Sequence, residues 1–180
     1  MEVLIGNNTG VKGYHAQEHR LTELKHPAKC RDREAWLGFG YYFWREPEYA
    51  HYWGQDKKSS GEYKSYDIYI AGLNIENCLN TVFNEEHYLF FIKKIEEAIQ
   101  YYQNRQKNVS LEMVNYFLAK NVWSKLGVKG IIYDDKPTNP RNKNRQYSVI
   151  PDLYYKKRIQ IVVFDLKNIS NFEPFLKEQK

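Results

Sequence analysis

The segment from Gly38 to Trp44 reads GFGYYFW, with two glycines around one aromatic residue and four aromatic residues after them. Glycine at the start of a strand allows a tight turn and a close approach of the backbone to another group. The segment therefore predicts a turn that enters a strand. Its aromatic rings can pack in the core or hold a flat ligand, and the local pattern leaves both roles open.

A short helix is predicted directly after this strand, because Pro47 suits the first helical position and acidic residues surround it. We expect the helix to run to about Trp53. Tyr42 of the strand and Tyr52 of the helix can then face one pocket from two sides. The following charged stretch, residues 54–65, predicts a turn or a flexible flap.

The rest of the chain mixes strand and helix patterns, which predicts an α+β domain. Two amphipathic helices are expected in the middle, the first capped by Asn84 and the second capped by Ser110 and ended at Gly127. A short helix is also expected from Gln17 to Leu24. The expected strands cover residues 3–5, 11–16, 38–44, 66–71, 73–79, 130–133, 147–150 and 159–165.

A chain of 180 residues without a Ser/Gly/Pro-rich linker predicts a single domain spanning residues 1–180. It contains no run of about 18 apolar residues and no signal-peptide pattern, so we expect a cytoplasmic protein without a membrane partner. Cys30 and Cys78 lie in unrelated contexts, without a CxxC motif. Neither a disulfide framework nor a metal site is therefore expected.

The formal net charge is +5, and basic residues gather at 136–145 and 156–158. Such clusters can contact an anionic partner, either nucleic acid or a phosphate-bearing cofactor. They can equally be solvated loops. Charge alone leaves open a third possibility, an RNA-binding protein that uses no cofactor.

Four short motifs follow one another along the chain: Tyr14-His15, Gly38 to Phe43, Ala50-His51-Tyr52 and Gln160 to Asp165. They resemble the motifs of the ADP-ribosyltransferase superfamily, in its diphtheria-toxin and poly(ADP-ribose) polymerase branch. They occur in the family's order over about residues 13–169, and parts of the chain are also similar to small bacterial members. The two helices within residues 84–126 fall where members of the family vary, as a two-helix insertion.

The resemblance implies a split mixed sheet that binds NAD as a substrate. In the roles that it implies, His15 hydrogen-bonds the adenosine-side ribose of NAD, and the backbone at Ala16 holds the nicotinamide amide. Tyr42 and Tyr52 sandwich the nicotinamide ring between flat faces, with Trp44 nearby. Ala16 departs from the usual glycine, and its methyl group is tolerable where the backbone is extended.

The implied reaction transfers ADP-ribose from NAD to a nucleophile through a transition state with oxocarbenium character. The family has a glutamate where this chain has Gln160. A neutral amide still accepts a hydrogen bond, but it lacks the charge, a deficit on the order of 10²–10³ in rate. The resemblance therefore implies mono-transfer rather than polymer formation. The acidic residues nearest to the motifs in sequence are Glu46, Glu48 and Asp165.

The expected function is an NAD-dependent mono-ADP-ribosyltransferase, with a bacterial toxin or a phage-defence effector as the candidate role. Its acceptor would be nucleic acid or protein, recognised by the basic segment 136–145, and an antitoxin or immunity protein would be a further partner. The alternative is a module of the same fold that binds NAD or ADP-ribose without turnover.

Overall fold

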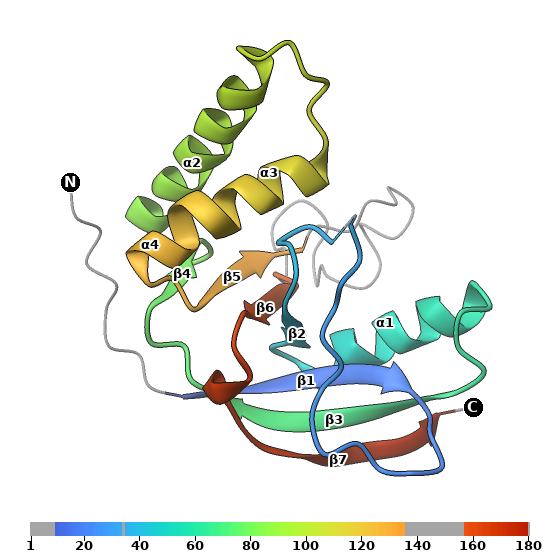
Figure 1. Cartoon of the computed structure of the whole chain (residues 1–180). Coiled ribbons are helices and arrows are strands. Elements are labelled where there is room, and N and C mark those ends of the chain that lie inside the picture. The colour runs from blue at the N-terminus through green and yellow to red at the C-terminus, as the bar shows by residue number, and fades with distance from the viewer. Residues whose placement is uncertain (1–9, 34, 136–156, 180) are drawn as a thin grey trace, which may run out of the picture.

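The computed structural model describes residues 10–33, 35–135 and 157–179 (Figure 1). In this part of the chain, seven strands form one mixed sheet in the order β4-β5-β6-β2-β1-β3-β7, which confirms an α+β architecture. The strands are β1 Val11–Glu18, β2 Tyr41–Trp44, β3 Tyr66–Leu73, β4 Cys78–Asn80, β5 Gly130–Asp134, β6 Ile159–Val163 and β7 Ile169–Gln179. The helices are α1 Pro47–Ser59, α2 Glu85–Gln103, α3 Leu111–Leu118, the π-helix η1 Ala119–Trp123, α4 Ser124–Leu126 and the 3₁₀ helix η3 Leu166–Asn168.

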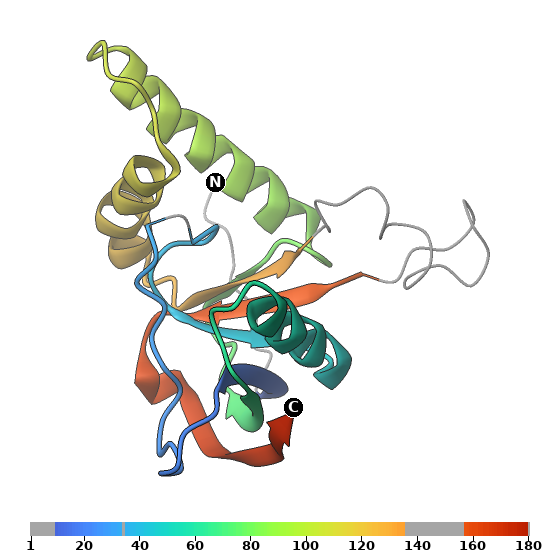
Figure 2. The same cartoon turned by 90° about the vertical axis from the view of Figure 1, so that its right-hand side faces the viewer.

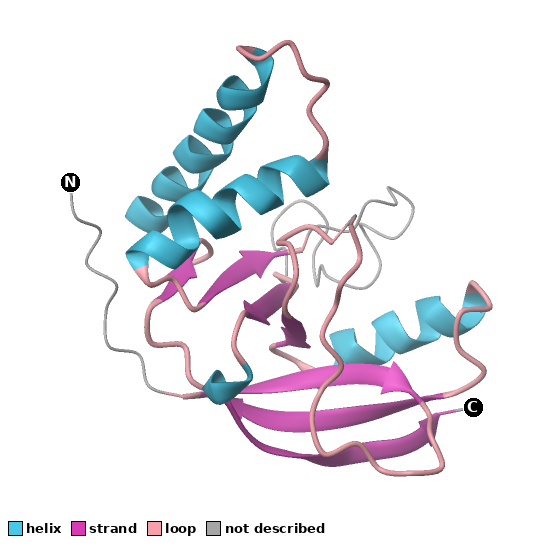
Figure 3. Ribbon diagram, in the orientation of Figure 1, coloured by secondary structure: helices cyan, strands magenta, loops and turns pink. Residues whose placement is uncertain are grey.

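The sheet has two halves that meet at one point. β1 pairs with β3 along its whole length, from Val11 opposite Leu73 to Glu18 opposite Tyr66. It pairs with β2 at a single register position, Tyr14 opposite Trp44. Figure 3 shows the strands β4, β5, β6 and β2 turning away from β1, β3 and β7. A gap therefore opens between β1 and β2 beside this junction.

A row of four residues crosses the junction. Tyr14 lies opposite Trp44, Trp44 lies opposite Gln160, and Gln160 lies opposite Tyr133. Residues directly opposite each other on paired strands project from the same face of a sheet. The row thus places side chains from β1, β2, β6 and β5 on one face.

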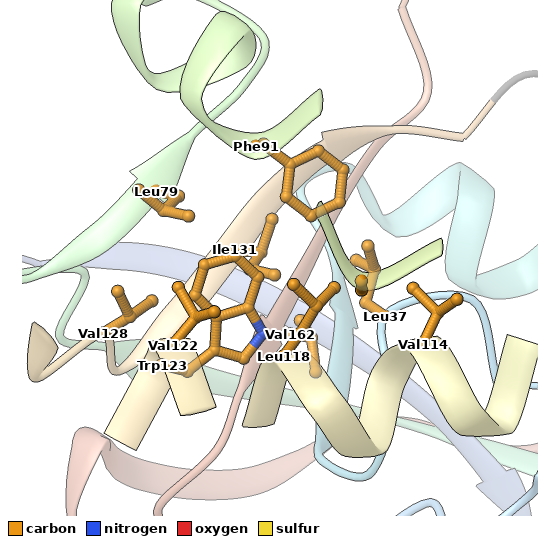
Figure 4. Close-up of a cluster of buried hydrophobic side chains, with 11 residues drawn as sticks. Leu37, Leu79, Phe91, Val114, Leu118, Val122, Trp123, Val128, Ile131 and Val162 are labelled. Atoms are coloured by element: carbon orange, nitrogen blue, oxygen red, sulfur yellow. The ribbon is translucent and has the colours of Figure 1, made fainter. Parts of the chain in front are cut away.

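The helices cover this face in two groups, which Figure 2 shows apart from each other. Helix α1 packs Tyr49 and Ala50 on Trp44 and neighbouring residues of the sheet. The helices from α2 to α4 pack on the other half in a cluster around Trp123 (Figure 4). Tyr42 of β2 packs against this cluster. Tyr42 and Trp44 are two residues apart on β2 and share a face. A second apolar cluster, around Phe43 and Ile161, fills the opposite face.

The predicted helix ends are confirmed. The Asn84 side chain accepts a hydrogen bond from the backbone nitrogen of His87 at 3.0 Å, and Ser110 accepts one from Met113 at 3.3 Å. Gly127 ends α4 with a left-handed φ of 67°. These ends were predictable because each depends on residues within one turn of the helix.

Three predictions about local structure were wrong. Residues 17–24 do not form a helix, because β1 continues to Glu18 in its pairing with β3. Helix α1 continues through buried Gly54 to Ser59, so only the end of 54–65 is turn-like. Strand β7 was not predicted. The expected strands at 3–5 and 147–150 and the basic segment 136–145 lie outside the described residues.

Candidate functional site

A cavity of about 460 Å³ lies beside the junction of the two half-sheets. Its walls come from β1, β2, β6, α1, the loop before β2 and the residue after β5. The lining includes five of the residues that the motifs singled out. They are His15, Ala16, Tyr42, Trp44 and Gln160.

Tyr52 was expected to belong to the NAD site, but it does not line this cavity. Its ring lies against Tyr49 and His51, with centroids 6.3 and 6.4 Å away. The next residue, Trp53, lines the cavity instead, with its ring 6.4 Å from that of Trp44. Consecutive helical residues point about 100° apart, so only one of two neighbours can face a given site.

His15 bridges the gap between β1 and β2. Its Nδ1 donates a hydrogen bond to the backbone carbonyl of Tyr42 at 2.8 Å, and Nε2 lies 3.3 Å from the Gln17 amide. The ring is buried and lies 5.5 Å from that of Phe43. Burial lowers the pKa of His15 below its ordinary value of 6.5. The imidazole is therefore neutral at pH 7.

This lowered pKa predicts a loss of stability in acid. The unfolded chain takes up a proton at His15 below about pH 6.5, whereas the folded chain resists it, so stability falls as the pH falls through this window. We expect wild type to lose more free energy of unfolding than His15→Asn between about pH 7.5 and pH 5.5. Urea unfolding at both pH values measures this difference. Equal losses in both proteins would contradict the buried, neutral state of His15.

The Tyr42 hydroxyl holds the turn that precedes β2. It donates to the carbonyl oxygen of Gly38 at 2.7 Å and accepts from the backbone nitrogen of Leu37 at 3.1 Å. Gly38 has a φ of 81°, which favours glycine. Burial raises the pKa of Tyr42, so the phenol stays protonated. Asn115 of α3 also donates to the carbonyl oxygen of Ala35 in this loop at 2.8 Å.

Ala16 fits the site without backbone strain. It lies in the regular pairing of β1, opposite Ile68, and is absent from the residues with positive φ. Its methyl group is buried and belongs to the cluster with Trp44 and Tyr49. Alanine is therefore compatible with this position of the wall, as an extended backbone allows.

The charged residues of the cavity were missed by sequence reasoning. Glu46, Glu48 and Asp165 do not line it, and Asp165 instead caps η3 by accepting from the Lys167 nitrogen at 3.0 Å. The acidic and basic residues that do line the cavity are Lys29, Asp32, Lys57, Glu62 and Asp135. Lys57 sits in the last turn of α1, and the other four sit in loops or directly after an element, where no local pattern marks them. Only the pairing of distant segments brings them to the site.

Comparison with known proteins gives no match, whether with family models, curated proteins or solved structures. Within residues 10–33, 35–135 and 157–179, no group of three His, Cys, Asp or Glu residues is placed to hold a metal ion. No helix in the same ranges has the length and apolar character needed to cross a membrane.

Proposed function

We propose that this protein is an NAD-dependent mono-ADP-ribosyltransferase and that the cavity beside the half-sheet junction binds NAD. One observation carries the proposal. Residues from three motifs far apart in sequence, on β1, β2 and β6, line a single cavity. The resemblance to the family implies that these motifs together build its NAD pocket.

The size and lining of the cavity suit NAD bound in part within it. A volume of about 460 Å³ falls in the usual range for small-molecule sites. Tyr42, Trp44 and Trp53 offer aromatic faces to a flat ring. Lys29 and Lys57 offer ammonium groups to the diphosphate. The resemblance to the family implies that a ribose of NAD lies against His15, which lines the cavity.

The proposed reaction breaks the bond between the nicotinamide nitrogen and C1′ of the ribose. The bonding electrons leave with nicotinamide, the acceptor nucleophile forms a bond to C1′, and a base takes the proton of the nucleophile. Gln160 contributes a side-chain oxygen that can accept a hydrogen bond from a ribose hydroxyl. The acceptor is nucleic acid or protein in this proposal, and water serves as acceptor in the absence of either.

The test is nicotinamide release from NAD by the purified chain, followed by chromatography. We expect release by wild type and its loss in His15→Ala, which removes the group bridging β1 and β2. The matched control is His51→Ala, because His51 lies on α1 outside the cavity, bonded to the Tyr66 hydroxyl at 2.9 Å. Release that is the same in both variants would contradict this placement of NAD.

A binding module without turnover is the second candidate, and Gln160 is the observation that favours it. A site with an amide where the family has a carboxylate holds ribose without stabilising positive charge. It predicts an NAD-dependent rise in melting temperature with no nicotinamide release. The absence of both signals would contradict both candidates and favour a protein that uses no cofactor.

We propose a bacterial toxin or a phage-defence effector as the biological role of this activity, with an antitoxin or immunity protein as a further partner. If the acceptor is nucleic acid, its affinity should fall steeply with salt because binding releases condensed counterions. Transfer that is insensitive to salt would favour a protein acceptor.

A further inference from the structure

We propose that Asp135 supplies the carboxylate that this site lacks at Gln160, and that it serves as the base of the reaction. The inference rests on the proposed function, because it assigns a role within that reaction. Asp135 and Gln160 line the same cavity. A charge beside the ribose can come from a neighbouring strand as well as from the motif position itself.

The strand register places Asp135 on the face that carries Gln160. Tyr133 lies opposite Gln160 in the antiparallel β5–β6 pair, and Asp134 lies opposite Ile159. Asp135 continues this register by donating its backbone N–H to the carbonyl oxygen of Arg158 at 2.8 Å. Side chains two residues apart share a face. Asp135 therefore projects beside Gln160, and Asp134 projects to the opposite face.

Arg158 orients the carboxylate. Its Nη2 lies 3.2 Å from Oδ2 of Asp135, and the side chains of Arg158 and Asp135 are only 11% and 24% exposed. The guanidinium in turn lies 5.1 Å from the centre of the Trp44 ring, a cation–π distance. A carboxylate held through one oxygen can direct the other oxygen toward the cavity.

The other acids of the cavity are less suited to this role. Glu62 is 54% exposed and is bound to Lys57 at 2.7 Å, and hydrogen bonding to Lys57 lowers its pKa. Asp32 is an exposed residue of the loop before β2. Burial raises the pKa of Asp135, opposed by the charge of Arg158. A carboxylate with a raised pKa is a stronger base than an exposed one.

Asp135 acts at two points of the proposed reaction. As the bond between C1′ and nicotinamide breaks, the electron pair leaves with nicotinamide and positive charge develops on the ribose. The carboxylate of Asp135 stabilises that charge. It then takes the proton of the acceptor's O–H or N–H group as the acceptor bonds to C1′, and releases this proton to solvent.

The matched pair Asp135→Asn and Asp134→Asn tests the assignment. Both remove one negative charge from neighbouring positions, but only Asp135 faces the cavity. We expect Asp135→Asn to lower single-turnover nicotinamide release about 10²–10³-fold, comparable to the loss of one electrostatic group. It should keep the NAD-dependent rise in melting temperature. Asp134→Asn should stay within about threefold of wild type, because Asp134 does not line the cavity and an amide oxygen can still accept the hydrogen bond that Asp134 receives from the Arg158 backbone nitrogen.

Two further measurements separate a catalytic role from a structural one. In wild type, release should fall in acid as Asp135 becomes protonated, and this limb of the pH profile should vanish in Asp135→Asn. The double variant Asp135→Asn/Gln160→Glu should release nicotinamide at least tenfold faster than Asp135→Asn, because it returns a carboxylate to the same face. Release by Asp135→Asn at the wild-type rate, or a double variant no faster than the single one, would overturn the assignment.

A folding defect in Asp135→Asn would not leave the question open. The double variant Asp135→Leu/Arg158→Met removes both partners of the pair. Proteins tolerate such replacements because neither charge is left buried without its partner. It should fold and release no nicotinamide, and release at the wild-type rate would again overturn the assignment. Failure of the proposed function has a different signature, since wild type itself would then release none.

Discussion

Tyr42→Ala is expected to abolish detectable NAD binding. The substitution removes an aromatic face from the cavity and also the hydroxyl that bonds to Leu37 and Gly38. Truncation of a central aromatic contact typically costs about 2–4 kcal/mol of binding free energy, and each 1.4 kcal/mol is about tenfold in affinity. Isothermal titration calorimetry with NAD measures the loss. Wild-type affinity in Tyr42→Ala would contradict the placement of NAD in this cavity.

Tyr42→Phe separates the ring from the hydroxyl. Stacking alone predicts that this variant binds NAD nearly normally. The structure adds a cost, because the Leu37 N–H and the Gly38 carbonyl both lose their partner. We therefore expect near-normal NAD affinity together with a loss of about 1–3 kcal/mol in the free energy of unfolding.

The matched control for Tyr42→Phe is Tyr41→Phe, on the adjacent residue of the same strand. Tyr41 packs with the cluster on the opposite face of the sheet, away from the turn. Its substitution should change the free energy of unfolding by less than about 0.5 kcal/mol. Equal losses in NAD affinity for Tyr42→Ala and Tyr42→Phe would instead assign the binding contact to the hydroxyl.

Phe91→Ala is expected to have the largest effect on stability. Phe91 of α2 is 5% exposed, and its ring stacks on that of Trp123 with centroids 6.2 Å apart (Figure 4). Its edge also meets Tyr133 of β5 at 6.1 Å. Removing a buried phenylalanine leaves a cavity and costs about 3–5 kcal/mol. That is a large part of the stability of an ordinary domain.

Leu89→Ala is the control for Phe91→Ala, because Leu89 lies on the same helix and is 57% exposed. We expect it to change the free energy of unfolding by less than about 0.5 kcal/mol. Urea unfolding, followed by tryptophan fluorescence, measures both variants. A similar small loss in Phe91→Ala would show that α2 does not contribute its buried face to the core.

The cavity residues that sequence reasoning singled out belong to short motifs. His15, Tyr42 and Gln160 were singled out, and the structure brings these three residues to one cavity. Tyr52 was the exception, because a helical pattern does not fix which of two neighbouring residues faces a site. That choice depends on how α1 packs against Trp44, which is a contact between elements.

The acidic and basic residues of the cavity were not predictable from the chain alone. Asp135 lies outside the four short motifs, and only the β5–β6 pairing places it on one face with Gln160. The acidic residues nearest to the motifs in sequence do not line the cavity, and one of them, Asp165, caps η3. Electrostatics depends on distance in space, so residues adjacent in sequence are a poor guide to it.

The sequence by itself determined the ends of α2 and α4, through Asn84 and Gly127, because caps need only neighbouring residues. It also determined the α+β class through the period of its apolar residues. Tertiary structure alone decided that residues 17–18 extend β1 rather than begin a helix, because pairing with β3 outweighs a weak local preference. It also decided that β1 and β2 diverge beyond the pair Tyr14–Trp44, which opens the cavity. The physical reason is that strand pairing joins segments that no local pattern connects.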